Sequence, residues 1–429
     1  MRAEKGSHLE TLQLVNRLIC VIFLICYSYQ FLFIPLVWLR GRKEAEGAPK
    51  PHRFAVLICA RNEAAVIGDL LESLRRQSYP QNLLTVFVMA DNCTDETARI
   101  AESAGAAVYK RCNAAQVGKG YALQELMGCI GRDFPDGFDG YFVFDADNIL
   151  SPDYIARMNA VFSRGHDIVT GYRNSKNYGD NWISAGHGLW FLRESRYLNH
   201  ARMLLGTSCC VGGTGFLFSR AVAEEMGPWP FHLLTEDIEF SVDQITRGRR
   251  IAFCPEAVLY DEQPTSFRQS WRQRSRWSKG YLQVFAGYGK RLLFGVFRGR
   301  FACYDMAMAI MPAFVLSAVS ILCNLVLAVW GAVAGENLRI AAQSVGEMLL
   351  GMYVTLFVIG AVTTVTEWRA IRTAAWKKVL YTFTFPLFMS TYIPIALSAL
   401  FTGGEWKPIT HRVSAASLRQ RPKQELLPF

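Results

Sequence analysis

The sequence predicts an α/β domain with a mostly parallel sheet and helices on both faces, flanked by apolar helices that cross a membrane. Continuous apolar runs are typical of strands that are covered on both faces. Three such runs occur, at residues 54–59, 86–90 and 141–144. Amphipathic helical patterns alternate with them, at residues 64–76, 94–104 and 120–130. This alternation of strands and helices favours a parallel sheet.

Four apolar stretches are long enough to cross a bilayer. They cover residues 14–39, 306–333, 346–366 and 379–401. The first exceeds the apolar region of a signal peptide and no small-residue cleavage site follows it, so we expect a retained anchor. Residues 367–378 contain two Trp and four basic residues, which predicts a helix lying on the lipid surface.

The chain is therefore expected to divide into four parts. A membrane anchor occupies 1–40, and a cytoplasmic domain that includes an amphipathic interface helix occupies 41–285. A membrane bundle of about three spans follows at 286–402, and a basic tail at 403–429.

Net charge is +10 over 429 residues, and basic residues gather beside the apolar stretches, as at 40–43 and 298–300. This placement favours positive-inside flanks of membrane helices and membrane lipids as partners, rather than nucleic acid. A bacterial plasma-membrane protein with its polar domain in the cytoplasm is expected. The 11 cysteines include no C-x-x-C pair, so we expect reduced thiols and no zinc site.

Acidic residues follow the predicted strands. Glu63, Asp91 and Asp145 fall at or just past three strand ends, and ligands of such sheets bind beyond those ends. Asp145 and Asp147 are spaced so that both can address a divalent cation and the diphosphate it bridges, although a solvated turn has the same pattern. Helix capping would explain Asn92 or Thr94 but gives Asp91 no local role.

Two later segments carry candidate catalytic groups. Lys119 lies between two glycines before a helical pattern, where it adds a positive charge to a backbone able to approach an anion. Thr235, Glu236 and Asp237 open another helical pattern. The alternatives there are a capped helix with acids in its first turn, or a general base at Asp237.

The segment 267–283 predicts a basic amphipathic helix in which Gln273, Arg276 and Trp277 lie near one face. Arg276 suits a diphosphate and Trp277 suits a sugar ring. An interfacial helix facing anionic lipid is the alternative for its other basic residues. Carboxylates for a cation, a base and an arginine for a phosphate leaving group together indicate glycosyl transfer from a nucleotide sugar.

These motifs resemble the membrane-embedded family-2 glycosyltransferases of the processive cellulose, chitin, hyaluronan and poly-N-acetylglucosamine synthase type. The resemblance implies a GT-A-type fold, Mg²⁺ or Mn²⁺ held by Asp147, and Asp237 as the base. It places Glu63, Asp91, Lys119, Asp145, Gln273 and Arg276 around the nucleotide sugar. Trp277 and Glu236 are assigned to the acceptor.

The expected function is an inverting transfer of sugar from a UDP-sugar to a growing β-linked polysaccharide. Two alternatives remain open. One is a non-processive transferase that adds a single sugar to a lipid carrier, and the other is a non-catalytic membrane protein that binds nucleotide sugars.

Overall fold

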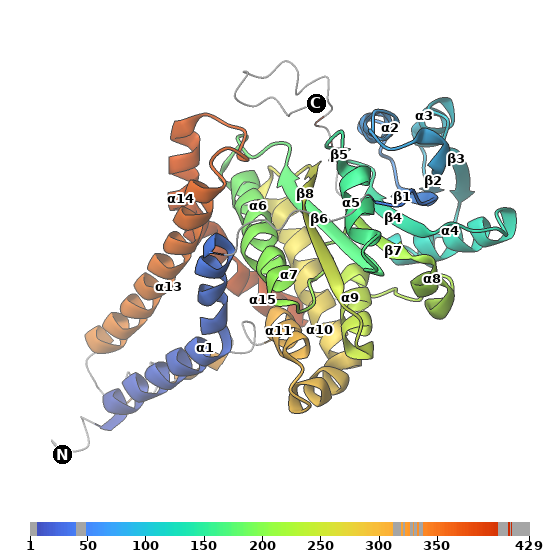
Figure 1. Ribbon diagram of the computed structural model, residues 1–429. Helices are drawn as coiled ribbons and strands as arrows, with labels where there is room; N and C mark the ends of the chain where they lie inside the picture. Colours follow the sequence, from blue (N-terminus) through green and yellow to red (C-terminus); the bar gives the residue numbers. More distant parts are fainter. Residues whose placement is uncertain are drawn as a thin grey trace.

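A computed structural model of the chain describes residues 7–39, 49–311, 319–320, 322–326, 329, 333, 338–401, 411 and 413. Nearly half of the predicted span at 306–333, the basic stretch at 40–48 and all of the tail except residues 411 and 413 lie outside these described residues. Figure 1 shows a sheet domain, with α1, α13 and α14 extending from one side of it.

The domain is built on one sheet whose strand order is β3-β2-β1-β4-β7-β6-β8-β5. Its strands are β1 (Phe54–Ala60), β2 (Leu84–Asp91), β3 (Ala107–Arg111), β4 (Gly140–Asp145), β5 (Ile149–Leu150), β6 (Ile168–Ser175), β7 (Phe216–Ser219) and β8 (Ile251–Asp261). Strands β1 to β4 pair in parallel, as do β6 and β8, whereas β7 and β5 pair antiparallel to their neighbours. The predicted, mostly parallel sheet is confirmed.

Helices and helical turns alternate with these strands and then continue past them. They are α1 (Ser7–Leu39), α2 (Ile67–Arg75), η1 (Gln81–Leu83), α3 (Thr97–Ser103), α4 (Lys119–Asp133), α5 (Tyr154–Phe162), α6 (Trp182–Arg193), η2 (Glu194–Asn199), α7 (His200–Leu205), α8 (Arg220–Met226), α9 (Glu236–Arg247), α10 (Phe267–Phe297), α11 (Phe301–Ile310), α13 (Leu338–Thr366), α14 (Ala375–Ser390) and α15 (Tyr392–Phe401). Helix α10 extends well beyond the 267–283 segment that the sequence pattern predicted.

Alternate residues of the central strand β1 pack on opposite faces of the sheet. Ala55 and Leu57 belong to the apolar core that contains α4, α9 and α10. Val56 and Ile58 belong to a second core that contains α2, α3 and α5. Because both faces are covered, strand β1 is almost wholly buried, as its unbroken apolar sequence predicted.

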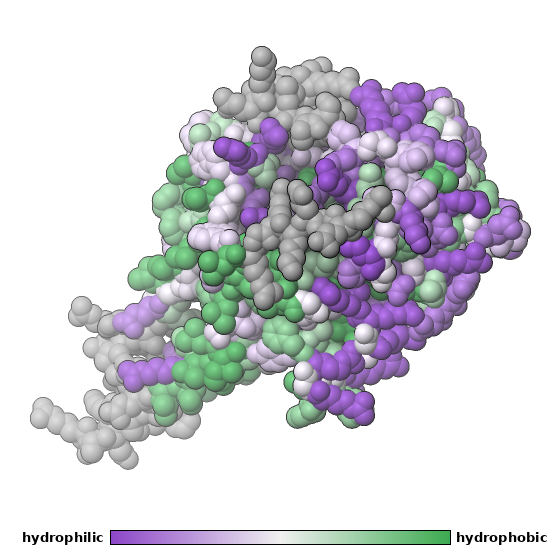
Figure 2. Space-filling view, in the orientation of Figure 1, coloured by the Kyte–Doolittle hydropathy of each residue, from purple (hydrophilic) through white to green (hydrophobic). Residues whose placement is uncertain are grey.

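Three helical stretches are long and apolar enough to cross a membrane: Leu14–Leu39, Gly346–Thr366 and Ala375–Phe401. They match three of the four predicted spans. Apolar side chains gather over the membrane helices at the lower left of Figure 2, while the sheet domain is mainly hydrophilic. The third stretch is interrupted between α14 and α15, where Pro394 cannot donate a backbone hydrogen bond to the preceding turn.

The expected lipid-surface helix at 367–378 is wrong for most of its length. Residues 367–374 form a turn, and helix begins only at Ala375. The turn docks on the sheet domain: Tyr172 donates a 2.7 Å hydrogen bond to Glu367, and Asn174 donates to the Ala370 carbonyl. A turn held by contacts with the domain therefore replaces most of the expected helix.

The first membrane helix is attached to the domain by polar as well as apolar contacts. Phe33 and Val37 of α1 pack against Tyr197 and Ala201. Arg202 of α7 makes a buried bidentate ion pair with Asp305 of α11, and Tyr29 donates a 2.6 Å hydrogen bond to the same carboxylate. Helices α1, α7 and α11 are thereby held together.

Candidate active site

The carboxyl ends of β1, β2 and β4 meet at one edge of the sheet. Ala60 of β1 is in register with Ala90 of β2, and Cys59 is in register with Asp145 of β4. Asp91 ends β2, Asp145 ends β4, and Glu63 follows β1 in the next turn. The parallel register thus gathers the three acids at one edge, as predicted.

Asp91 has a local structural role, contrary to expectation. Arg111 donates a 2.7 Å hydrogen bond to its Oδ1 atom in a buried ion pair, and Asn92 donates to the same oxygen. Arg111 also pairs with Glu125. Asn92 has φ +52°, a left-handed conformation in which asparagine is several-fold enriched. The predicted nucleoside contact of Asp91 stays a prediction.

Lys119 lies at the centre of the site. It is the first residue of α4, after Gly118 with φ +138°. Its Nζ atom pairs with Asp145 and donates a 2.7 Å hydrogen bond to the Gly213 carbonyl. Burial alone would lower the pKa of Lys119, but Asp145 and Glu236 outweigh it and the pKa is raised. Lys119 is therefore a fixed cation, already ion-paired before any diphosphate binds.

Glu236 and Asp237 occupy the first turn of α9. Thr235 precedes them but makes no side-chain capping hydrogen bond, whereas the acids do lie in the first turn of the helix, as that alternative expects. A Cβ atom at Gly213, where φ is +87°, would lie 3.5 Å from Oδ2 of Asp237. The Gly213 turn thus brings Asp237 beside Lys119 and Asp145.

The two adjacent carboxyls of α9 hold protons more tightly than usual. Burial, and then the charge of Asp237, raise the pKa of Glu236 to about 7. Burial also raises the pKa of Asp237. A backbone hydrogen bond at Ile238 and the positive charges of Lys119 and Arg276 oppose this shift. A carboxyl whose pKa approaches neutrality suits proton transfer at physiological pH.

A close helix contact brings the predicted cationic and aromatic residues to these carboxyls. A Cβ atom at Gly280 of α10 would lie 2.5 Å from the Thr235 side chain, so only glycine permits this approach. Arg276 is near enough to act on the pKa of both Glu236 and Asp237. The close contact at Gly280 thus places Arg276 of α10 near Asp237 of α9, about 40 residues earlier in the sequence.

Gln273 and Trp277 lie on the same helix as Arg276. Oε1 of Gln273 is buried and accepts no hydrogen bond from any described residue, which leaves an acceptor available for a ligand donor. The Trp277 ring packs edge-on against His187 and Phe191 of α6. Arg274 lies between Gln273 and Trp277 in the sequence but contacts the break in the third span. It donates hydrogen bonds to Thr391 and to the Phe388 carbonyl.

Asp147 lies two residues beyond Asp145 and is buried. The Glu262 N–H donates a 2.7 Å hydrogen bond to its Oδ2 atom. Although burial alone would raise the pKa of Asp147, the charges of His411 and Lys176 together with this hydrogen bond lower it. Asp147 is therefore ionised, as a metal ligand must be.

His411 is a site residue that the sequence did not reveal. Its Nδ1 atom lies 3.0 Å from Oε1 of Glu63, and its segment is fixed by Val413, whose N–H donates to Glu262. Burial alone would lower the pKa of His411, but Asp147 and Glu63 outweigh it and raise the pKa to about 10. No motif surrounds His411 in the basic tail, so no local signal pointed to it.

Arg173 is a second residue that the motifs missed. Its guanidinium pairs with Asp261 at the end of β8, donates 2.7 Å to the Gly212 carbonyl and stacks on Phe191. It links the 212–215 turn to the Asp147 side of the site. Only the position of Arg173 near the end of a strand could have pointed to it.

The residues present fit a divalent cation that is shared with a nucleotide. In the part of the chain that the structure describes, no group of three or more His, Cys, Asp and Glu side chains could hold a metal alone. Mg²⁺ typically binds through one or two carboxylates plus substrate phosphates and water. Asp147 could supply such a carboxylate, with Asp145 beside it.

The chain belongs to the family described as glycosyltransferase-like family 2, which it matches over residues 51–280, more than half of its length. The matched region contains every predicted site residue from Glu63 to Trp277. The family and the sheet together define a GT-A-like glycosyltransferase fold.

Curated relatives lie within the same class. A probable glycosyltransferase of Bacillus subtilis is 27% identical, over 61% of this chain and 63% of its own. A β-monoglucosyldiacylglycerol synthase of Synechocystis is 25% identical, over 57% and 51%. A poly-β-1,6-N-acetyl-D-glucosamine synthase of Staphylococcus epidermidis is 22% identical, over 54% and 55%. The chain thus spans about half to two thirds of the length of these relatives.

Among solved structures, a mannosyltransferase of Pyrobaculum calidifontis in complex with GDP-mannose and Mn²⁺ has the same fold. It superposes with a TM-score of 0.56 at 16% identity, covering 90% of this chain and 99% of the other.

Proposed function

We propose that the protein is a membrane-bound, inverting glycosyltransferase that transfers sugar from a UDP-sugar to an acceptor hydroxyl. One observation carries the proposal. Asp237 lies beside Lys119 and within the electrostatic reach of Arg276, so a half-buried base stands next to two cations. This arrangement suits a reaction that takes a proton from one oxygen and leaves negative charge on another.

The proposed step is a single displacement at the anomeric carbon. The acceptor oxygen forms a bond to that carbon as the bond to the diphosphate oxygen breaks. Asp237 takes the acceptor proton, and UDP leaves with the electron pair. Arg276 and Lys119 stabilise the leaving diphosphate. Because one base acts and no carboxylate forms a covalent intermediate, an α-linked donor gives a β-linked product.

The donor is expected to bind with Mg²⁺ or Mn²⁺. Asp147 would hold the cation, which would neutralise charge on the diphosphate. The buried, ionised state of Asp147 supports this assignment, as does the Mn²⁺ bound to the mannosyltransferase of the same fold. Glu63, Asp91 and Asp145 are assigned to the nucleotide sugar, and the Oε1 atom of Gln273 is a free acceptor for one of its hydroxyls.

A growing β-linked polysaccharide is the first candidate acceptor. Trp277 lies one residue from Arg276 on α10, where an aromatic side chain could keep a sugar end bound between transfers. Helix α10 also contacts the break between α14 and α15 through Arg274. Transfer would therefore occur directly beside a membrane span.

Transfer of one sugar to a lipid is the second candidate. The Synechocystis relative, named for a glucosyldiacylglycerol product, covers more of this chain at higher identity than the polysaccharide synthase does. Purified protein in lipid should be incubated with a panel of UDP-sugars and Mn²⁺, and the product sized. A polymer supports the first candidate, a singly glycosylated lipid supports the second, and no transfer to any acceptor contradicts the proposal.

The catalytic domain is proposed to face the cytoplasm, from the basic residues that flank the apolar stretches. Cys112 is exposed on that domain. A membrane-impermeant maleimide should therefore label Cys112 only after cells are permeabilised. Labelling of intact cells at Cys112 would reverse the proposed orientation.

A further inference from the structure

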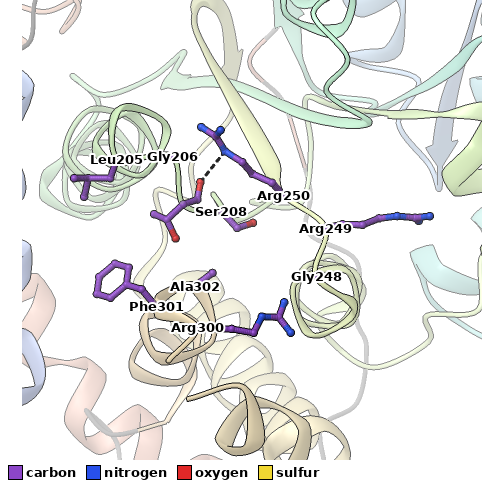
Figure 3. Close-up of a pocket in the computed structure, with 10 residues that line it drawn as sticks. Leu205, Gly206, Ser208, Gly248, Arg249, Arg250, Arg300, Phe301 and Ala302 are labelled. Carbon is purple, nitrogen blue, oxygen red and sulfur yellow. Dashed lines mark hydrogen bonds between the residues drawn. The ribbon is translucent and has the colours of Figure 1, made fainter. Parts of the chain in front are cut away.

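A second concave site lies at the end of the sheet domain opposite to the donor site. It is an open pocket of about 620 Å³, bounded by the turn after α7, the turn after α9 and the start of α11 (Figure 3). Arg250 directly precedes β8, whereas Asp261 ends that strand beside Asp147. The length of an 11-residue strand therefore separates the two sites.

Two of the three arginines that line the pocket form no ion pair. Arg250 donates to the carbonyls of Thr207 and Met203, and Arg300 donates to those of Thr246 and Ile245. Within the described residues, no carboxylate pairs with either guanidinium. Arg249, by contrast, pairs with Glu225. Among the residues that the structure describes, these two guanidinium charges thus have no counter-charge, and the carbonyl contacts fix where they lie.

The geometry also leaves hydrogen-bond donors at these two residues. No described residue accepts a hydrogen bond from Nη1 of Arg250 or from Nε of Arg300, whose other nitrogens make the carbonyl contacts above. Guanidinium groups held in this way are suited to phosphate oxygens.

The rim of the pocket is apolar and adjoins the first membrane span. Phe301 of the lining contacts Tyr29 of α1 edge-on, with ring centroids 5.4 Å apart. Tyr304, one turn further along α11, donates to the Cys26 carbonyl of α1. Leu205 at the rim and Phe297 at the end of α10 are 46% and 87% exposed. The pocket therefore adjoins the first membrane span through Phe301, and exposed apolar side chains are available beside it.

We propose that this pocket binds the phosphate headgroup of an anionic phospholipid. Arg250 and Arg300 would contact the phosphate, and the exposed apolar side chains would lie along the acyl chains. Basic pockets beside membrane helices on the cytoplasmic side suit such headgroups. The proposal does not depend on the sugar-transfer reaction, because it uses none of the donor-site residues.

The test measures binding of phosphatidylglycerol to full-length protein in neutral detergent, by native mass spectrometry over a lipid titration. Each basic residue near an anionic surface contributes about a fivefold gain in affinity, so the Arg250→Gln/Arg300→Gln variant should bind about 30-fold more weakly. The matched control is Arg291→Gln/Arg298→Gln, which removes two arginines of the same region that do not line the pocket. It should bind like the wild type.

A second pair of variants keeps both arginines and so avoids loss of their structural contacts. Ala302→Glu places a carboxylate on the pocket wall and should abolish binding, whereas Ala302→Gln, of the same size, should retain it. Equal weakening in the two arginine variants would show diffuse charge attraction and overturn the proposal. Phosphatidylcholine binding as tightly as phosphatidylglycerol, or inorganic phosphate displacing the lipid, would overturn it as well.

Discussion

His411 contacts Glu63 across 348 positions of sequence, with Nδ1 of the imidazole 3.0 Å from Oε1 of the carboxylate. The contact brings a segment that follows the last membrane span to the edge of the sheet where the donor is proposed to bind. Val413 fixes the same segment through Glu262, whose own N–H holds Asp147. The proposed donor site therefore combines residues of the sheet domain with a segment far along the chain.

His411→Ala should loosen this segment. It removes a charge-assisted hydrogen bond, so the Val413 amide, which donates to Glu262, should lose about tenfold in hydrogen-exchange protection. His232→Ala is the control, since His232 contacts Gln124 on the opposite side of the site. Unchanged protection of Val413 in His411→Ala would show that Val413 alone holds the segment.

Asp237→Asn should separate catalysis from binding. The amide keeps the shape of the side chain but cannot accept the acceptor proton, so turnover should fall by roughly 10²–10⁴-fold. UDP binding, measured by calorimetry, should persist. Asp243→Asn, on the same helix and paired with Arg247, is expected to lower stability more than turnover. Activity of Asp237→Asn within about twofold of wild type would rule out the base assignment.

Glu236→Gln should change the pH dependence of kcat/KM. Wild-type kcat/KM should decline towards acid pH as Asp237, whose pKa is raised, becomes protonated, and a separate step should appear near pH 7, where Glu236 titrates. Because the Asp237 charge raises the pKa of Glu236, Asp237 ionises first, so Glu236→Gln should remove the step near pH 7 and keep the decline at lower pH. Glu224→Gln, an exposed control, should leave the profile in place. An unchanged profile in Glu236→Gln would show that the step does not come from Glu236.

Chelation of divalent cations should stop turnover, and Asp147→Asn should do the same while weakening UDP binding. The physical reason is that the diphosphate charge would then lack its bridging cation. Turnover is measured with and without added Mn²⁺, and Asp153→Asn, whose carboxylate pairs with Arg157 at the surface, is the control. Full activity in chelator would contradict the assignment of Asp147.

Trp277→Ala should shorten the product more than it slows hydrolysis of the donor, because the ring is proposed to hold the acceptor end. Trp271→Ala removes a tryptophan from the same helix that contacts Phe267, and should leave product length unchanged. Chromatographic sizing of the products distinguishes the two. Equal effects of both variants would mean that Trp277 only supports the packing of α10 on α6.

The sequence by itself predicted the mostly parallel sheet and three candidate membrane helices, and it named most residues of the proposed site. Short apolar runs that alternate with amphipathic helical patterns favour buried parallel strands, and parallel strands place the residues after their ends at one edge. Glu63, Asp91 and Asp145 could therefore be brought together without coordinates. Asp237, Arg276 and Trp277 were recognised from their motifs, because sugar transfer needs those residue types.

Only the tertiary structure decided which groups neutralise one another. Asp91 pairs with Arg111 and Lys119 with Asp145, and neither pair has a sequence spacing that could reveal it. The segment 367–374 docks on the sheet domain as a turn instead of forming the expected helix, and His411 reaches Glu63 from a position 348 residues away. Such contacts depend on how separate elements pack, for which local periodicity carries no information.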